Sequence, residues 1–478
     1  MKKISAIILC AAACTSLTAC GVSASGDAQT EQTTAATVTE ATTVTETEST
    51  AATQTASASK TYLTKDDISV NETIENSENG GHAISADGES ASYSNVQVTK
   101  TGDSDGDEAD FYGENAAVFA TNGGTLDLKN MIIETNGTHA NAVFSYGEGS
   151  TVNISDSYIT TDGDCSGGIM TTGGAVMNAS NLTIHTTGRS SAAIRSDRGG
   201  GTVTVNGGSY TTDGAGSPAI YSTADITVND ALLESTAAQG VVVEGKNSVT
   251  LNDVELIADN NTKNSDKSDW YQAVMIYQSM SGDADEGTSS FEMNGGSLTN
   301  KKGDIFFVNN TVTTIDLSNV DIENEDTEGV FLRAAAAGWG NEGSNGGQVT
   351  LTAADQVING NIIVDEVSNL NLYLTEGSTF TGAINADGQA GEVYVELDSG
   401  SKWVLTSDAY ITSLTCEAGA IDLNGHTLYI NGTAYTGQAS TGEAIEATVS
   451  TGGHGNGGPG GSAPSGGQGG QPPAKPGE

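Results

Sequence analysis

Apolar and polar side chains alternate along residues 90–435 in short runs that recur at a nearly constant spacing. Eight of these runs align on one apolar anchor position, occupied by Leu128, Ile154, Ala179, Val205, Val228, Leu251, Met293 and Leu317. Six of the seven intervals between anchors are 23 to 26 residues long, and the seventh, of 42 residues, contains an insertion. Because alternate side chains of a strand point to the same side, each run predicts a short strand with one buried face.

Three further positions repeat with the anchor. The residue two places before it is always apolar: Leu126, Val152, Met177, Val203, Ile226, Val249, Phe291 and Ile315. The residue five places after it is apolar or aromatic: Ile133, Ile159, Ile184, Tyr210, Leu233, Leu256, Leu298 and Ile322. The residue two places after it is always Asn, Asp or Gly: Asn130, Asp156, Asn181, Gly207, Asp230, Asp253, Gly295 and Asn319. These three residue types tolerate a left-handed backbone, so we expect two strands per repeat with a sharp corner between them.

A third run precedes each pair, as in AAVFAT from Ala116, PAIYST from Pro218 and QGVVVE from Gln239. Three short strands in about 24 residues are typical of one coil of a parallel β-helix, whose stacked coils bury a continuous apolar column. Weaker copies extend the pattern to Val98 on one side and to Leu351, Leu372, Val395 and Leu423 on the other. The predicted fold class is therefore all-β, a right-handed single-stranded parallel β-helix (solenoid) of about 13 coils and roughly 60 Å in length.

The two ends of the chain have different compositions from the middle. Residues 1–19 carry two lysines followed by an apolar stretch, which indicates an export signal, and residues 20–60 are a Thr/Ala/Glu-rich segment expected to be a disordered tether. The β-helix domain is expected over 61–435, and the Gly/Pro-rich residues 436–478 are expected to be a disordered tail. The sequence LTAC ending at Cys20 resembles the lipobox of bacterial lipoproteins. That resemblance implies a lipid on Cys20 and a protein anchored on the extracellular face of a bacterial membrane, at the cell surface.

Charge and cysteine usage narrow the possible partners. The net charge of −44 makes nucleic acid an improbable partner, because phosphate binding needs clustered lysine and arginine. Cys165 and Cys416 lie about ten coils apart in the predicted rod, so they cannot form a disulfide within one molecule.

No catalytic set of residues is evident, so we expect a protein that is not an enzyme. GDCSGG, from Gly163 to Gly168, is better explained as a corner between strands than as a nucleophile loop. The five histidines have no metal-binding spacing and are expected to be solvated. Three of the four arginines, Arg189, Arg195 and Arg198, belong to one coil; they form a basic patch for an acidic sugar, or they pair with neighbours such as Asp197.

Three insertions interrupt the repeat, and function on a regular scaffold is usually found in such loops. The first ends at Trp270 and Tyr271, and the second and third are expected at the same corner two coils apart. A groove between them would expose aromatic rings beside carboxylates, which suits the C–H faces and hydroxyls of a sugar. The predicted carbohydrate-binding residues are Trp270, Tyr271, Asp283, Asp285, Glu286 and Trp339. The alternative is that the two tryptophans only cover the apolar coil beneath them.

The stretch DSDGDEADFYGE, residues 103–114, has nearly the spacing of a calcium loop. The candidate ligands are Asp103, Asp105, Asp107 and Glu114, at positions 1, 3, 5 and 12. Glu108 stands where an EF-hand needs glycine, which excludes an EF-hand. The stretch is expected to be the corner between the Val98 strand and the AAVFAT strand, either as an adaptable Ca²⁺ site or as a plain solvated loop.

With the lipobox, the coils and repeat phrases such as NGGSYTTDG and ITVND, the chain resembles bacterial surface β-helices, namely pertactin-like adhesin passengers and carbohydrate-binding β-helix cell-surface proteins. The resemblance covers residues 90–435. It implies a non-catalytic adhesin or carbohydrate-binding lipoprotein that contacts an extracellular polysaccharide, a host glycan or a host protein. Two alternatives stay open: a pectinase-like polysaccharide lyase or hydrolase, and a structural surface spacer.

Overall fold

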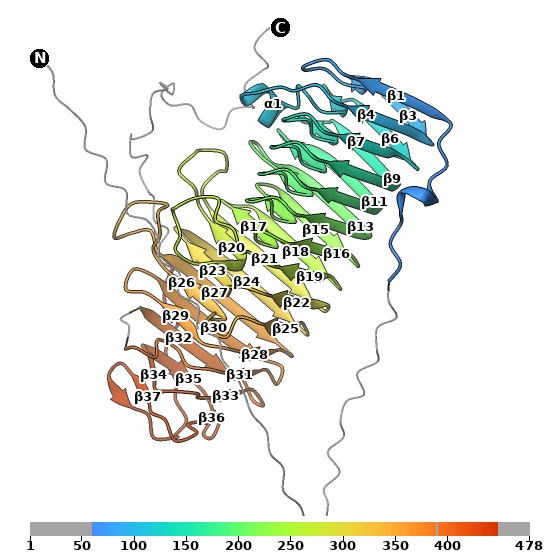
Figure 1. Cartoon of the computed structure of the whole chain (residues 1–478). Coiled ribbons are helices and arrows are strands. Elements are labelled where there is room, and N and C mark those ends of the chain that lie inside the picture. The colour runs from blue at the N-terminus through green and yellow to red at the C-terminus, as the bar shows by residue number, and fades with distance from the viewer. Residues whose placement is uncertain (1–59, 389–390, 448–478) are drawn as a thin grey trace, which may run out of the picture. The chain divides into compact units, whose positions relative to one another are not determined.

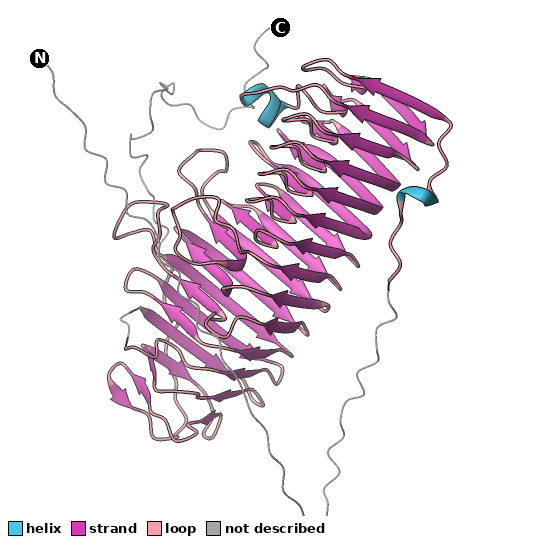
Figure 2. Ribbon diagram, in the orientation of Figure 1, coloured by secondary structure: helices cyan, strands magenta, loops and turns pink. Residues whose placement is uncertain are grey.

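The computed structural model describes residues 60–388 and 391–447 (Figure 1), which form a parallel β-helix of about 13 coils. Strands account for almost all of the regular structure (Figure 2). Cys20, the export signal, the expected tether except Lys60, and residues 448–478 of the expected tail lie outside the described residues. Within the described ranges, no helix has both the length and the apolar character needed to cross a bilayer.

Two long parallel sheets form most of the coils. The 20-stranded sheet contains β1 (Glu72–Asn76), β3 (Ser90–Ser94), β4 (Val96–Lys100), β6 (Thr125–Lys129), β7 (Ile132–Thr135), β9 (Thr151–Thr161), β11 (Ala175–Thr186), β13 (Gly201–Thr212), β15 (Asp225–Asn229), β16 (Leu232–Ser235), β18 (Ser248–Asn252), β19 (Glu255–Ala258), β21 (Thr288–Asn294), β22 (Ser297–Asn300), β24 (Thr311–Ser318), β25 (Asp321–Asn324), β27 (Gly347–Ala354), β30 (Asn369–Thr375), β32 (Glu392–Leu397) and β35 (Ser413–Thr415). The 11-stranded sheet contains β2 (Ile84–Asp87), β5 (Val118–Thr121), β8 (Val143–Tyr146), β10 (Ile169–Thr172), β12 (Ile194–Ser196), β14 (Ile220–Ser222), β17 (Val241–Glu244), β20 (Gln272–Tyr277), β23 (Asp304–Asn309), β26 (Leu332–Ala334) and β29 (Ile362–Val364).

The last coils close with two smaller sheets. One contains β28 (Val357–Asn359), β31 (Thr379–Thr381), β33 (Lys402–Val404) and β36 (Ile421–Asp422), and the other contains β34 (Ala409–Ile411), β37 (Leu428–Ile430) and β38 (Thr433–Ala434). The pairing of β37 with β38 is antiparallel, unlike the parallel pairing of the coils. The described helices are the short 3₁₀ helix η1 (Lys65–Asp67) and α1 (Asp107–Tyr112).

The predicted register of the repeat is confirmed. Each anchor pairs with the next along the 20-stranded sheet, in the order Leu128, Ile154, Ala179, Val205, Val228, Leu251, Met293 and Leu317. All eight anchors are buried, as are the eight residues two places before them. In the column five places after, only Ile322 is partly exposed. The apolar column is therefore one continuous core, as the periodicity predicts.

The assignment of the terminal copies to the anchor column was wrong. Val98 pairs with Ile133 and so belongs to the column five places after the anchor. Leu351, Leu372 and Val395 pair with one another, but they continue from Ile315, two places before the anchor. Leu423 is not the residue opposite Val395, because Leu414 of β35 takes that place. Both columns are apolar, so composition alone does not distinguish them.

The predicted corner is confirmed at every one of the eight positions. All eight residues have a positive φ, between 50° and 71°. The corner side chains also bond along the stack: Asn181 Nδ2 donates to Asp156 Oδ1 over 2.8 Å. A second amide ladder links Asn206, Asn229, Asn252 and Asn294 at 2.8 to 3.0 Å. Asn and Asp therefore suit the corner for two reasons: they tolerate the left-handed backbone, and their side chains form hydrogen bonds with the next coil.

The chain continues on the coils beyond both expected boundaries. The Lys60 ammonium pairs with Asp230 at 2.6 Å, and Thr183 donates to the Leu63 carbonyl. At the other end Ile445 exchanges two hydrogen bonds with the side chain of Asn371, at 2.8 and 2.9 Å. Residues 436–447 therefore lie on the last coils, although the sequence predicted a tail there.

Candidate functional site

The outer face of the 11-stranded sheet has an unusual column of side chains. The residues that lie opposite one another along it are Phe119, Phe144, Met170, Arg195, Tyr221, Val242, Met275, Phe307, Arg333 and Ile363. Large apolar side chains on an outer face need a cover, and two small apolar clusters lie there. The segment containing α1 lies on one cluster, and the insertions that contain Trp270 and Trp339 pack on the other. The candidate sites lie where these covering segments meet the sheet.

Helix α1 is short and lies close to the coils. It begins after Gly106 and ends at Gly113, whose φ of 76° is left-handed. Ala109 is fully buried, and the Phe111 carbonyl accepts a hydrogen bond from Thr172 over 2.7 Å. A Cβ on Gly113 would lie 2.7 Å from the Phe119 ring, so glycine is required for the close approach. The sequence predicted this segment as a corner and did not predict the helix.

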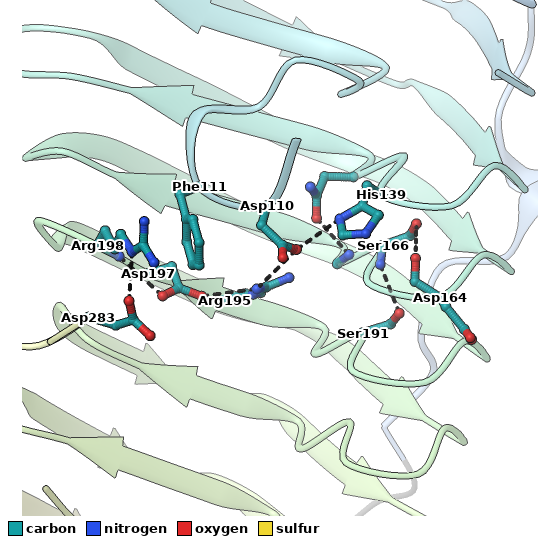
Figure 3. Close-up of polar contacts among 12 residues, drawn as sticks. Asp110, Phe111, His139, Asp164, Ser166, Ser191, Arg195, Asp197, Arg198 and Asp283 are labelled. Atoms are coloured by element: carbon teal, nitrogen blue, oxygen red, sulfur yellow. Dashed lines mark hydrogen bonds and ion pairs between the residues drawn. The ribbon is translucent and has the colours of Figure 1, made fainter. Parts of the chain in front are cut away.

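Under α1 lies a cluster of buried and partly buried polar side chains (Figure 3). His139 Nδ1 lies 2.9 Å from Asp110 Oδ1, and His139 is only 7% exposed. The Cys165 thiol joins them: the ligand atoms of Asp110, His139 and Cys165 all lie within 4.8 Å of one another. The burial of His139 contradicts the prediction that this histidine is solvated. In residues 60–388 and 391–447 no other group brings three such ligand atoms together so closely.

The surroundings shift the pKa values of Asp110 and Cys165 in opposite directions. Burial would raise the pKa of Asp110, but the contact with His139 and the charge of Arg195 hold that pKa below its ordinary value. Burial raises the pKa of the Cys165 thiol, and the carboxylates of Asp110 and Asp164 raise it further. The cluster therefore favours a carboxylate at Asp110 beside a protonated thiol at Cys165.

Arg195 and Asp197 form a buried ion pair next to this cluster. Arg195 Nη2 lies 2.9 Å from Asp197 Oδ2 and 3.9 Å from Asp110 Oδ1. Burial raises the pKa of Asp197 to about 6, although Arg195 acts against it. The arginine divides its charge between two carboxylates, so neither one receives the full attraction.

Arg198 connects two covering segments. It pairs with Asp107 of α1 at 2.9 Å and with Asp283 of the second insertion at 2.6 Å. Its guanidinium lies 3.7 Å from the centre of the Phe111 ring. Of the two interpretations of the arginine cluster, the structure favours pairing with neighbours, because Arg195 and Arg198 both have carboxylate partners.

The four acids predicted to hold calcium do not converge. Asp103 accepts a hydrogen bond from the Thr138 amide over 2.8 Å, and Glu114 accepts one from Ser104 over 3.0 Å. The Asp105 side chain is fully exposed, and Asp107 pairs with Arg198. Each of the four acids therefore has different surroundings near α1. Calcium binding by this set stays a prediction without geometric support.

The predicted sugar-binding residues divide among four hollows. The second and third insertions do lie at the same corner, after β20 and β26, with β23 between them. The hollow that they share holds Glu286 but measures only about 40 Å³. The structure does not bring these residues into the single groove predicted from the sequence. Trp270, Tyr271 and Trp339 line a second hollow, and Asp283 and Asp285 line a third. A fourth, of about 460 Å³, is lined by Asp285 and Glu286 of the second insertion.

The second hollow, of about 140 Å³, is lined by aromatic side chains that pack on the sheet. The ring centres of Trp270 and Phe307 are 5.6 Å apart, and the Arg333 guanidinium carbon lies 4.7 Å from the centre of the Trp270 ring. Trp339 packs edge-on against Tyr277 at 5.1 Å. The alternative that the tryptophans cover the sheet accounts for these contacts.

The third hollow, here called the polar cleft, is the largest of these at about 650 Å³. Its walls include Tyr112 of α1, Tyr146 of β8, Arg198 and the loop that contains Asp283 and Asp285. The two tyrosine rings meet edge-to-face at 5.4 Å, and both are partly exposed. The cleft combines aromatic surface with charged hydrogen-bonding groups, and it lies between two covering segments and not within a coil.

A further groove of about 500 Å³ follows the corner of the 20-stranded sheet. Its lining includes Asn153 and Asn178, which are bonded to each other at 2.9 Å. Asn153 also donates to Asp127 over 2.8 Å. These amides are largely used within the stack, so this groove offers a ligand fewer free donors than the polar cleft.

Sequence reasoning missed the Asp110, His139 and Cys165 cluster, although a signal was present. His139 and Cys165 are 26 residues apart, which is one coil, and both have a φ of 54° at equivalent corners. The His139 amide donates to the Asp164 carbonyl, and the Cys165 amide donates to the Arg189 carbonyl. The repeat length therefore stacks the two side chains, whereas the motif search looked for close spacing along the chain.

The fold and these clefts define a class: a parallel β-helix whose outer face is covered by one short helix and three insertions. No protein-family model, curated protein or solved structure matches the chain.

Proposed function

We propose that the protein is a non-catalytic carbohydrate-binding β-helix of the bacterial cell surface, anchored through Cys20, and that the polar cleft is its binding site. The supporting observation is the cleft itself. It has about 650 Å³ of space, within the range of roughly 300–1,000 Å³ that small-ligand sites occupy. Tyr112 and Tyr146 offer rings to the C–H faces of a sugar, and Lys246, Asn247 and Asp225 offer hydrogen bonds to its hydroxyls.

The charge of the cleft favours a neutral or amino-bearing sugar. Its lining includes the four carboxylates Glu148, Asp225, Asp283 and Asp285 against the two cations Arg198 and Lys246, which leaves a net charge of −2. Both cations are already paired, Arg198 with Asp283 and Lys246 with Asp285 at 2.8 Å. An acidic polysaccharide would meet uncompensated negative charge here, on a protein whose net charge is −44.

The test is a glycan array that spans neutral, amino-bearing and acidic saccharides, run with calcium and again with a chelator. We expect binding to neutral or amino-bearing glycans that is unchanged by the chelator. Tyr146→Ala should weaken it by about tenfold, the loss expected for one stacked ring at roughly 1–1.5 kcal/mol. Asp225→Asn should selectively weaken amino-bearing ligands.

The matched control is Tyr158→Ala, which removes a partly exposed tyrosine from the 20-stranded sheet. Its binding should equal that of the unmodified protein. Absence of binding across the array, or equal losses in the Tyr146 and Tyr158 variants, would refute the assignment of the cleft. Release of reducing or unsaturated ends from a bound polymer would overturn the non-catalytic part of the proposal.

A further inference from the structure

The side chains of Asp110, His139 and Cys165 come from three successive levels of the rod. Asp110 lies on α1, in the connection between β4 and β5; His139 lies between β7 and β8, and Cys165 between β9 and β10. Their ligand atoms nonetheless lie within 4.8 Å of one another. The coils fix the separation of His139 and Cys165, and the packing of α1 brings Asp110 over them.

The contact between the nitrogen and the oxygen of this cluster is close but poorly aligned. His139 Nδ1 and Asp110 Oδ1 are both buried, and neither has an aligned hydrogen bond despite their separation of 2.9 Å. A buried polar atom left in this state costs free energy unless a ligand or ion completes it. An imidazole that is 93% buried, and whose contact with a carboxylate is not an aligned hydrogen bond, is therefore the observation that points to a ligand.

The spacing suits a small metal ion. Two N or O ligands at 2.0 to 2.1 Å from tetrahedral zinc are separated by about 3.3 Å. The His139–Asp110 separation of 2.9 Å is within a few tenths of an ångström of that distance. A sulfur ligand about 2.3 Å from the metal would lie about 3.6 Å from the other two ligand atoms, so the cysteine side has to close by up to about 1.2 Å from the 4.8 Å limit.

The donor types select among metals. One imidazole, one thiolate and one carboxylate form the mixed N, S and O set that zinc and related divalent transition metals prefer. Calcium takes six to eight oxygen ligands, so this cluster does not suit it. A neighbouring group also fits, because Asp197 offsets the positive charge of Arg195 beside the cluster.

We propose that Asp110, His139 and Cys165 bind one divalent transition-metal ion of the zinc type, with a fourth position left for water. The thiol releases its proton to solvent as the metal–sulfur bond forms. The ion fastens α1 to the corners of the two following coils. This site is separate from the polar cleft, and it does not depend on the proposed carbohydrate binding.

The experiment uses the full chain, purified in reductant without a histidine tag, loaded with zinc and dialysed, with the metal content measured by mass spectrometry. We expect one equivalent of zinc per chain and a higher melting temperature than after chelation. Cobalt loading should give intense ligand-field bands of a tetrahedral site together with thiolate charge-transfer absorption. Cys165→Ser, an almost isosteric change, should abolish the charge-transfer band and lower zinc affinity at least tenfold. His139→Ala should lower zinc affinity at least as much.

Matched controls use the same residue types elsewhere in the described chain. Cys416→Ser alters the other free cysteine, and His185→Ala alters an exposed histidine paired with Asp213. Both should retain one equivalent of metal. Substoichiometric zinc in the unmodified protein, or zinc retained by folded Cys165→Ser, would overturn the proposal. Circular dichroism of each variant separates loss of metal from loss of fold, and unchanged glycan binding by Cys165→Ser would leave the proposed function intact.

Discussion

A column of glycines lies at the corner that leads from the 20-stranded sheet to the 11-stranded sheet. Gly137, Gly163, Gly188 and Gly214 follow one another at one-coil spacing. A Cβ on any of them would lie 1.8 to 2.0 Å from the carbonyl oxygen of the glycine one coil earlier. We predict that Gly188→Ala is among the most destabilising single-methyl additions in this chain.

The magnitude follows from the obstructing atoms. The new methyl group would lie 1.9 Å from the Gly163 oxygen, 2.4 Å from its carbonyl carbon and 2.9 Å from the Asp164 nitrogen. All three are backbone atoms, so no side chain can rotate away. A carbon–oxygen contact needs about 3.3 Å, so the coils must separate locally by about 1.4 Å.

Separation of that size breaks the hydrogen bonds on either side. The Thr187 amide donates to Thr161 over 2.9 Å, and the Cys165 amide donates to Arg189 over 2.8 Å. Two lost bonds at about 1 kcal/mol each, added to about 1–3 kcal/mol for overpacking, give a loss of roughly 3–5 kcal/mol.

The assay is equilibrium unfolding in urea, with hydrogen exchange to localise the effect. Exchange should accelerate at the corners on either side of residue 188, because each coil contacts only its neighbours. Gly207→Asn is the control: it lies in the positive-φ column, a Cβ there meets nothing within 4 Å, and Asn occupies the same place in the preceding coil. Its free energy of unfolding should change by less than about 0.5 kcal/mol. A Gly188→Ala loss as small as that of Gly207→Asn would refute the reasoning.

Three further predictions concern the covering segments and the buried pair. Burial raises the pKa of Asp197 from 3.8 to about 6, so the protonated carboxyl stabilises the fold below pH 4 and this contribution is lost as the pH rises through 6. The free energy of unfolding in urea should therefore fall by about 3 kcal/mol between pH 4 and 7 through this group, and Asp197→Asn should remove that fall. Arg198→Ala should accelerate hydrogen exchange in both segments that it joins, whereas Arg189→Ala should leave exchange there unchanged. Trp270→Ala should cost about 2 kcal/mol in thermal unfolding, because a half-buried ring loses roughly half of the 3–5 kcal/mol of a buried one, and an unchanged melting temperature would contradict its role as a cover over Phe307.

The repeat was predictable because one physical requirement recurs in every coil. A buried face with period two and a left-handed corner leave few acceptable residues, so Asn130, Asp156 and Asn181 mark the corner from sequence alone. In the end coils the column to which each apolar residue belongs was harder to predict, because two adjacent columns are both apolar. Leu351 satisfies either column, and only the pairing with Ile315 shows which one it occupies.

The covering segments could not be predicted in the same way. Their positions depend on contacts with side chains far away in the sequence, as when Arg198 meets Asp107 and Asp283 across 91 and 85 residues. The predicted groove failed for this reason: the insertions were placed correctly at one corner, but their direction was not encoded in the repeat. His139 and Cys165 were predictable in principle, because their separation of 26 residues equals one coil.

The proposed metal site and the proposed sugar cleft share one element. Asp110 belongs to the metal cluster and Tyr112 lines the cleft, and both lie on α1, a helix of six residues. A helix this short has little stability of its own, so its position depends on what fastens it. Arg198 fastens it on the cleft side, and a bound ion would fasten it on the other. Glycan binding that is unchanged by a chelator and by Cys165→Ser would therefore show that the Arg198 contacts are enough to hold Tyr112 in the cleft.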